Sequence, residues 1–286
     1  MKDLGYYNGR VGRIADMTVP MNDRACTFGD GVYDATYARN HVIYNLSAHV
    51  ERFFSSAEKL RIRIPMERKR LAALLSDLVK QVDDGEQFVY FQVTRGTAPR
   101  NHVFPDVPAN LWVMLTPAKV RDNSRPVRLI TVEDTRFFHC DIKTLNLIPN
   151  VMASQKAKEA GCDEAVFHRG DRVTECAHSN VSILENGRFV TAPTDSLILP
   201  GIARSNLIRT CRKLGIPVVE EPFTVERMMR AQEVIVSSSG SFCLSASEID
   251  GVPVGGGAPA LLAALRKELT DDFLLATEPD PTIENS

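Results

Sequence analysis

The sequence predicts an α+β fold with two domains. Strand-like and helix-like segments are mixed along most of the chain, and its 286 residues suit one large or two medium domains. The segment Pro117–Pro126 is polar and bracketed by prolines, as linkers between domains often are. We therefore expect an N-terminal domain over residues 1–118, a linker over 119–126 and a C-terminal domain over 127–286.

Turn chemistry and apolar periodicity predict the elements of the first domain. Asn8-Gly9 tolerates the positive φ of a type I′ turn, which predicts an opening hairpin over Tyr6–Val11. Apolar residues at helical spacing predict a helix from about Ser47 to Leu60, and Pro65 is expected to open a second helix. Branched and aromatic residues predict strands at Gly31–Ala38, His41–Tyr44, Gln87–Val93 and Leu111–Leu115.

The second domain is predicted in the same way. It begins with the strand Val127–Val132, and a helix from about Pro149 to Ala160 stops at Gly161. Glycine-containing turns predict hairpins, which lie at Arg169–Asp171, Asn186–Gly187 and Asp250–Gly251. Apolar periodicity predicts three further helices, over Ile202–Leu214, Val225–Ala231 and Pro259–Leu269.

The composition excludes several classes of function. Hydrophobic residues make up 44% and charged residues 24% of the chain, and the net charge is −2, so neither nucleic acid nor an anionic membrane surface is an expected partner. We expect no membrane span and no signal peptide, because the chain has no apolar run of the required length. The six cysteines have neither Cys-x-x-Cys nor metal-ligand spacing, which predicts free thiols, no metal site and a cytoplasmic location.

Two residues have the chemistry that pyridoxal phosphate requires. Lys143 lies in Cys140-Asp141-Ile142-Lys143-Thr144-Leu145-Asn146, and burial of a lysine favours the neutral amine that attacks carbonyl groups. Glu175 is placed at a strand end, where a carboxylate can keep a pyridine nitrogen protonated. Each residue alone is a weak signal, because most lysines and glutamates are solvated surface charges.

Two further segments are candidates for binding a phosphate group. Pro200-Gly201-Ile202-Ala203-Arg204 opens a predicted helix, and the backbone N–H groups at a helix N-terminus bind anions. Ser237-Ser238-Ser239-Gly240-Ser241 supplies hydroxyl groups and flexible backbone after a predicted strand. A helix cap and a turn are the ordinary explanations of these two patterns.

Longer motifs relate the chain to a known family. Residues Val173–Val181 contain Thr-Glu-x-x-x-Ser-Asn, and Phe91–His102 contains Arg-Gly-x-x-Pro-Arg-x-His. Together with the surroundings of Lys143, these motifs resemble the fold-type IV pyridoxal-phosphate aminotransferases, and D-amino-acid aminotransferases most closely, and the resemblance covers nearly the whole chain in motif order and spacing. The resemblance implies a smaller N-terminal α/β domain and a larger C-terminal domain with a barrel-like sheet.

The resemblance also implies the cofactor and the residues that bind it. Pyridoxal 5′-phosphate would form a Schiff base with Lys143, and Glu175 would bind its ring nitrogen. Arg52, in a His-x-x-Arg setting, matches the family's phosphate-binding arginine. The other residues that match its phosphate cup are Ile202, Ala203, Ser238 and Ser239.

The substrate-binding residues follow from the same resemblance. Tyr33, Arg100 and His102 match the positions that trap the substrate α-carboxylate, and arginine suits this task because its planar fork donates two parallel hydrogen bonds. In the family the arginine and the histidine reach the site from the neighbouring subunit, which implies a homodimer with a shared active site. His178 stands where D-amino-acid aminotransferases usually have serine, so the resemblance does not determine which D-amino acids this chain prefers.

We therefore expect a transaminase that exchanges an amino group between a D-amino acid, such as D-alanine, and a 2-oxo acid, such as 2-oxoglutarate or pyruvate. Three alternatives remain at this point. They are a branched-chain L-amino-acid aminotransferase, a lyase of the same fold resembling aminodeoxychorismate lyase, and a cofactor-carrying protein without catalysis. The sequence does not identify the preferred side chain, the amino acceptor or the pathway.

Overall fold

The chain forms two compact units, which the computed structural model describes over residues 1–279. The remaining residues, 280–286, belong to the expected C-terminal domain and lie outside the described residues. The first unit comprises Met1–Val120, Ile142–Asn146 and the residues from Phe273 onward, and the second comprises Arg121–Asp141 and Leu147–Asp272. The first break between the units, after Val120, falls within the expected linker 119–126, but two later segments that were expected in the C-terminal domain belong to the first unit.

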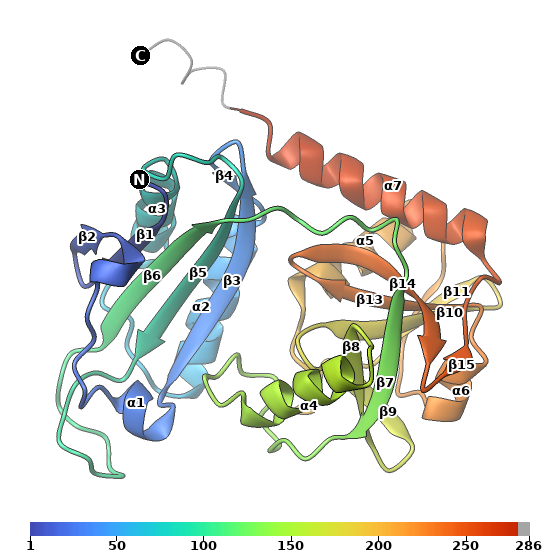
Figure 1. Cartoon of the computed structure of the whole chain (residues 1–286), viewed down its shortest axis with the longest axis horizontal. Helices are drawn as coiled ribbons and strands as arrows, with labels where there is room; N and C mark the ends of the chain where they lie inside the picture. Colours follow the sequence, from blue (N-terminus) through green and yellow to red (C-terminus); the bar gives the residue numbers. More distant parts are fainter. Residues whose placement is uncertain (280–286) are drawn as a thin grey trace. The chain divides into compact units, whose positions relative to one another are not determined.

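The first unit is built on an antiparallel sheet (Figure 1). Its six strands follow the order β2-β1-β6-β5-β3-β4. The strands are β1 (Leu4–Tyr7), β2 (Arg10–Gly12), β3 (Gly31–Arg39), β4 (Val42–Ile43), β5 (Gln87–Thr94) and β6 (Asn110–Pro117). Asn8 and Gly9 have φ values of +46° and +96°, which confirms the predicted turn between β1 and β2.

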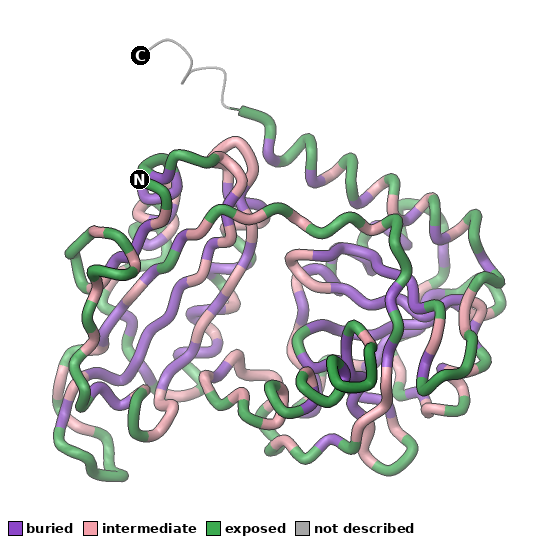
Figure 2. The backbone as a smooth tube through the Cα atoms, viewed as in Figure 1, coloured by how far each residue is buried: buried purple, intermediate pink, exposed green. Residues whose placement is uncertain are grey.

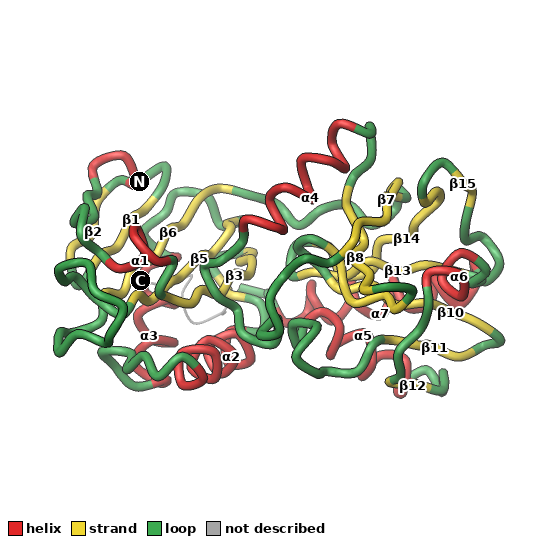
Figure 3. The backbone as a smooth tube through the Cα atoms, turned by 90° about the horizontal axis from the view of Figure 1, so that it is seen from below, coloured by secondary structure: helices red, strands yellow, loops and turns green. Residues whose placement is uncertain are grey.

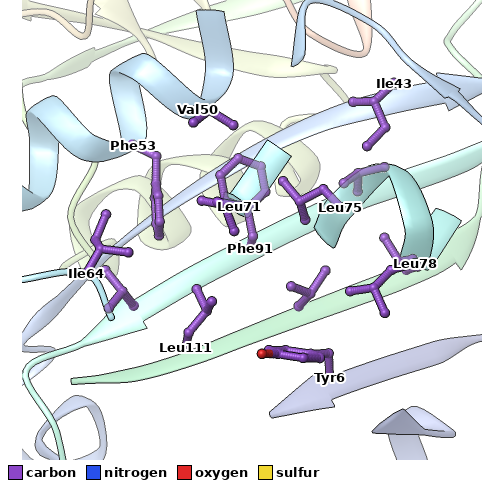
Figure 4. Packing of buried hydrophobic residues seen from close by; sticks show 14 of the residues in the cluster. Tyr6, Ile43, Val50, Phe53, Ile64, Leu71, Leu75, Leu78, Phe91 and Leu111 are labelled. Atoms are coloured by element: carbon purple, nitrogen blue, oxygen red, sulfur yellow. The ribbon is translucent and has the colours of Figure 1, made fainter. Parts of the chain in front are cut away.

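Two helices cover one face of this sheet, as Figure 3 shows for α2 and α3. The helical segments are a short 3₁₀ turn (Ile14–Asp16), α1 (Arg24–Phe28), α2 (Leu46–Lys59) and α3 (Arg68–Val79). Phe53 of α2, Leu71 of α3 and Phe91 of β5 are fully buried and pack in one cluster (Figure 4). Burial of such apolar side chains is the main force that holds the helices on the sheet.

The predicted start of the second helix at Pro65 is wrong. The helix α3 begins at Arg68, with Glu67 as its extended N-cap residue. Ile64 is buried and Met66 packs against the core, so the chain bends at Pro65 to bury these neighbours before the helix begins. Packing therefore outweighs the preference of proline for the first helical turn.

The second unit contains a sheet of nine strands. Eight strands follow the order β12-β11-β10-β13-β14-β7-β8-β9, and β15 pairs with β14. Figure 2 shows that buried residues are concentrated along strands. The strands are β7 (Val127–Glu133), β8 (Glu164–Arg169), β9 (Arg172–Cys176), β10 (Asn180–Glu185), β11 (Arg188–Thr191), β12 (Val218–Glu220), β13 (Glu233–Ser238), β14 (Ser241–Ile249) and β15 (Val252–Pro253).

The connection between β9 and β10 shows that this sheet is curled. The two strands lie five places apart in the sheet, which in a flat sheet is about 24 Å. Only three residues, 177–179, join them, and the Cα atoms of Cys176 and Asn180 can therefore be at most about 14 Å apart. The sheet must bend back on itself, which confirms the expected barrel-like sheet of the larger domain.

Four helices complete the second unit: α4 (Ile148–Glu159), α5 (Ile202–Lys213), α6 (Val225–Met229) and most of α7 (Pro259–Ala276). The helix α7 is longer than predicted. Its residue Phe273 belongs to the first unit and is buried against Tyr44 of the same unit, with ring centroids 5.1 Å apart, and this packing extends the helix. Within residues 1–279, none of the helices has the length and apolar character that crossing a membrane requires.

Candidate functional site

The segment around Lys143 is bound to the first unit by backbone hydrogen bonds. Tyr33 N–H donates to the Lys143 carbonyl at 3.0 Å, and Leu145 N–H donates to the Gly31 carbonyl at 3.2 Å. Between these bonds Val32 and Thr144 form an antiparallel bridge, so the segment acts as a short extra strand beside β3. This pairing places Lys143 in the first unit, although the sequence position is well past the linker.

Lys143 and Tyr33, both predicted site residues, are in contact. Lys143 Nζ donates a hydrogen bond of 3.3 Å to the Tyr33 hydroxyl and lies 4.3 Å from the centroid of that ring. Tyr33 in turn stacks on Tyr90, with centroids 5.3 Å apart. Burial, with a contribution from Tyr33, raises the pKa of Tyr90, so Tyr90 remains a neutral hydrogen-bond donor to Gln92 at 2.6 Å.

Arg52 is held by a buried carboxylate that the sequence did not reveal. This carboxylate is that of Asp34. Arg52 Nε and Nη2 each donate a hydrogen bond to it at 2.8 Å, and His49 Nδ1 donates to it at 2.8 Å. Burial alone would raise the pKa of Asp34, but Arg52 and the His49 hydrogen bond outweigh it and hold the pKa well below its usual range. Burial lowers the pKa of His49 despite Asp34, so the imidazole is neutral at pH 7.

The two predicted carboxylate-binding side chains meet on one aromatic ring. The Arg100 guanidinium carbon lies 4.8 Å from the centroid of Phe28, and the His102 ring lies 5.2 Å from it. Both side chains are exposed. Within residues 1–279, no hydrogen bond, ion pair or ring contact joins either of them to Tyr33. Arg100 and His102 thus contact the same ring, whereas Tyr33 contacts Lys143.

Glu175 lies in the second unit and has a well-defined set of donors. It is 6% exposed. Arg136 Nη1 donates to Oε1 at 2.5 Å, while the Asn180 amide and the Leu199 backbone N–H each donate to Oε2 at 3.0 Å. Hydrogen bonds from a cation and two N–H groups stabilise the ionised carboxylate. Glu175 can therefore offer a negative charge to a protonated ring nitrogen.

Sequence reasoning missed Arg136, which orients Glu175. Asp134 receives two hydrogen bonds from this guanidinium, at 3.0 and 2.9 Å, and the Phe167 ring centroid lies 4.6 Å from its carbon. Burial would lower the pKa of Arg136, but Asp134 and Glu175 outweigh it and raise the pKa, so the side chain stays charged. The opposite charges of Asp134 and Arg136 just after a predicted strand were the only sequence signal.

At the start of the first phosphate-binding candidate, the backbone of Gly201 lies very close to the Asn180 side chain. Gly201 is the N-cap of α5, and Ile202 and Ala203 are its first helical residues. A Cβ atom at Gly201 would lie 1.9 Å from Asn180 Oδ1, so only glycine fits there while Asn180 keeps its place. The first N–H groups of the helix have no acceptor within the helix and carry its positive dipole end. Asn180 therefore links Glu175 directly to this turn.

The second phosphate candidate lies at the β13–β14 turn. Ser238 Oγ and Ser241 Oγ are hydrogen-bonded at 2.8 Å, and Ser239 lies in the turn between them. Ser237, the first residue of the predicted segment, is 1% exposed, and its hydroxyl has no hydrogen-bond partner within the described residues. Ser237 is paired with Asn180 in the sheet register, so this buried hydroxyl lies beside the Gly201 turn. An unpaired hydroxyl beside free backbone N–H groups fits an oxygen-rich anion.

His178 has an ordinary structural partner. Its side chain is 65% exposed, and its Nδ1 lies 3.2 Å from the carboxylate of Glu164. The backbone N–H of His178 and the hydroxyl of Ser179 also donate to Glu164, at 3.0 and 2.8 Å. These contacts fix the β9–β10 connection next to Glu175.

Comparison with known proteins gives a consistent set of relatives. The family described as amino-transferase class IV matches residues 31–249. The D-alanine aminotransferase of Listeria innocua is 41% identical and covers 87% of this chain and 89% of its own length. That of Bacillus licheniformis is 35% identical, with coverages of 90% and 92%.

Solved structures of branched-chain aminotransferases share the fold. The enzyme of Escherichia coli superposes with a TM-score of 0.88 at 20% identity and covers 97% of this chain and 96% of its own. The enzyme of Thermoproteus uzoniensis, determined with norvaline, has a TM-score of 0.86 at 21% identity, with coverages of 95% and 97%. At these identities the likeness establishes the fold and not the substrate.

Proposed function

We propose that this chain, which belongs to the class IV aminotransferases, exchanges an amino group between a D-amino acid and a 2-oxo acid. The observation that supports the substrate class is that Arg100 and His102, two side chains able to bind a carboxylate, both contact the Phe28 ring. The full-length similarity to D-alanine aminotransferases supports the same choice. The branched-chain alternative has support from fold likeness alone.

Pyridoxal phosphate is the cofactor of this family, and it supplies an electrophilic carbon and an electron-accepting ring. With the cofactor bound, Lys143 would provide the amine that holds its aldehyde carbon, and the same amine would move the proton at the substrate Cα. The Tyr33 hydroxyl orients Lys143 Nζ from 3.3 Å. Glu175 keeps the ring nitrogen protonated, because Arg136 and Asn180 hold its carboxylate ionised and oriented.

The phosphate group is assigned to the residues that fit an anion. These residues are the backbone N–H groups of Ile202 and Ala203, the hydroxyls of Ser238 and Ser239, the buried hydroxyl of Ser237, and Arg52. Asp34 fixes the orientation of the Arg52 guanidinium by two hydrogen bonds. Helix N-termini and arginine forks both favour phosphate oxygens.

We assign the substrate α-carboxylate to Tyr33, Arg100 and His102. Arg100 and His102 are exposed on their own chain and do not contact its Tyr33, which supports a homodimer in which they serve the neighbouring subunit. The six free cysteines support a reducing compartment, and we place the protein in the cytoplasm on that ground. The proposal covers D-amino acids as a class and names no preferred substrate side chain.

A panel of D- and L-amino acids with 2-oxoglutarate or pyruvate tests the proposal, with the new keto acid as the readout. We expect turnover of D-alanine or another D-amino acid and little turnover of L-amino acids. A preference for L-leucine or L-valine would favour a branched-chain enzyme. Product formation without any amino acceptor would indicate a lyase of the same fold.

Glu175→Gln is expected to slow the chemical step by roughly 10- to 100-fold, because the loss of a charged hydrogen bond at the ring nitrogen weakens the electron sink. Single-turnover kinetics followed by cofactor absorbance measure this step. Glu233→Gln is the matched control, since Glu233 is equally buried and accepts a hydrogen bond from the Ala258 backbone. An unchanged rate in Glu175→Gln would remove Glu175 from this role.

Gly201→Ala is expected to weaken cofactor binding by roughly 10- to 100-fold. The added Cβ would displace Asn180, which then loses its hydrogen bond to the charged Glu175. The dissociation constant for pyridoxal phosphate measures the effect. Gly12→Ala is the control, because a Cβ there meets only the Met17 sulfur at 3.5 Å. Equal cofactor affinity in both variants would show that Asn180 can move without cost.

A further inference from the structure

The short helix α1 is bonded to the segment that carries the predicted carboxylate-binding residues. Arg24 N–H donates to the Gly96 carbonyl at 3.0 Å, and Arg95 N–H donates to the Asp30 carbonyl at 3.0 Å. These bonds join the first residue of α1, and Asp30 just after the helix, to the beginning of the Arg95–His102 segment. All of these residues belong to the first unit.

The Arg24 side chain extends this connection to the far end of the segment. It is 3% exposed, a low value for an arginine. Its Nε donates to Asp30 at 2.7 Å, and its Nη1 donates to the backbone carbonyl of Asn101 at 2.5 Å. Asn101 is the residue between Arg100 and His102, so this bond fixes the backbone from which both side chains project.

Arg24 also contacts the ring on which those two side chains rest. Its guanidinium carbon lies 4.7 Å from the centroid of Phe28, compared with 4.8 Å for Arg100 and 5.2 Å for His102. Phe28 is therefore surrounded by two cations and an imidazole. Cations near an aromatic face are attracted by its quadrupole, which favours this arrangement over a dispersed one.

A second arginine fixes the acid that orients Arg24. Arg95 Nε donates to Asp30 at 2.9 Å, and its Nη2 donates to the Leu60 carbonyl at 2.8 Å at the end of α2. Asp30 thus accepts from two guanidinium groups. These bonds hold the Asp30 carboxylate in place for its hydrogen bond with Arg24.

We propose that Arg24 is the positioning residue of the carboxylate-binding segment. It holds the Asn101 carbonyl and the Phe28 ring together, so that Arg100 and His102 are presented as a pair. This inference rests on the proposed function of those two residues. Arginine is required because one planar fork bonds both Asp30 and Asn101, whereas a lysine ammonium on a flexible stem cannot hold both acceptors in this geometry.

The test is Arg24→Lys in the loaded enzyme, with Arg266→Lys as the matched control. Arg24→Lys keeps the charge but loses the bond to Asn101 or the bond to Asp30. We expect KM for D-alanine to rise about tenfold or more, with kcat changed by less than about threefold and no change for amines that lack a carboxylate. Arg266 is a half-buried arginine of the second unit, and its guanidinium donates to the Cys243 carbonyl and the Ser245 hydroxyl, so the KM of Arg266→Lys should stay near that of the parent.

Two further measurements separate positioning from a general loss of structure. Phe28→Leu keeps an apolar side chain but removes the ring, and it should raise KM in the same direction. In the Arg100→Ala background, Arg24→Lys should raise KM less than it does in the parent, because part of its effect acts through Arg100. An unchanged KM in Arg24→Lys, an equal rise in Arg266→Lys, or fully additive effects with Arg100→Ala would each overturn the assignment.

Titration with propionate distinguishes this inference from the proposed function. Propionate carries a carboxylate but no amine, and its binding to the loaded enzyme can be followed by cofactor absorbance. Its affinity should fall about tenfold in Arg24→Lys, whichever amino acid the parent turns over. A parent without D-amino-acid turnover would refute the proposed function, while unchanged propionate affinity in Arg24→Lys would refute the role of Arg24.

Discussion

Lys143→Ala is expected to reduce transamination by at least about 1,000-fold while the protein still folds. The variant loses the amine that binds the cofactor and the base that moves the substrate proton, and both losses affect every turnover. The fold should survive because the segment is held by backbone bonds, from Tyr33 N–H to the Lys143 carbonyl and from Leu145 N–H to the Gly31 carbonyl. Steady-state rates and circular dichroism measure the two effects.

Chemical labelling identifies the lysine independently of activity. Borohydride reduction of the yellow parent enzyme, followed by peptide mapping, should place the pyridoxyl group on Lys143. Lys158→Ala is the control, because Lys158 is an exposed residue of α4. A label on another lysine, or a Lys143→Ala variant with the rate of the parent, would contradict the assignment.

The sequence was most informative where a structural feature depends on neighbouring residues. The Asn8-Gly9 turn needs only residues that accept a positive φ, and it was predicted correctly. The helices α2 and α5 have apolar stripes, and their predicted ends lie within one residue of the observed ends. The start of α3 was missed because burial of Ile64 and Met66 delays the helix beyond Pro65.

The sequence did not predict contacts between side chains that lie far apart along the chain. Asp34 has no motif of its own, and its significance comes from Arg52, 18 positions later. Arg136 and Glu175 are 39 positions apart, and nothing in either segment specifies the pairing. The strand formed by residues 142–146 adds to β3 through main-chain bonds, which leave no side-chain pattern in the sequence. Lys143 was found by its family motif, but its place in the first unit was not.

Arg100→Ala is expected to lower kcat/KM for D-amino acids by roughly 30- to several-thousand-fold, because removing one partner of a desolvated charge pair typically costs about 2–5 kcal/mol. Amines without a carboxylate should be little affected, since they make no use of the guanidinium. Arg63→Ala is the control, because Arg63 is an exposed arginine outside the segment. Unchanged D-amino-acid kinetics in Arg100→Ala would overturn the functional assignment itself.

Mixing Lys143→Ala with Arg100→Ala determines which subunit uses the segment. If Arg100 serves the neighbouring subunit, each mixed dimer contains one site with both lesions and one site with none, so activity should return after subunits exchange. If Arg100 serves its own subunit, every site retains one lesion and mixing restores nothing. The exposed position of Arg100 and His102, away from Tyr33 of the same chain, favours the first outcome. Recovery of activity would therefore support both the homodimer and the shared carboxylate site in one measurement.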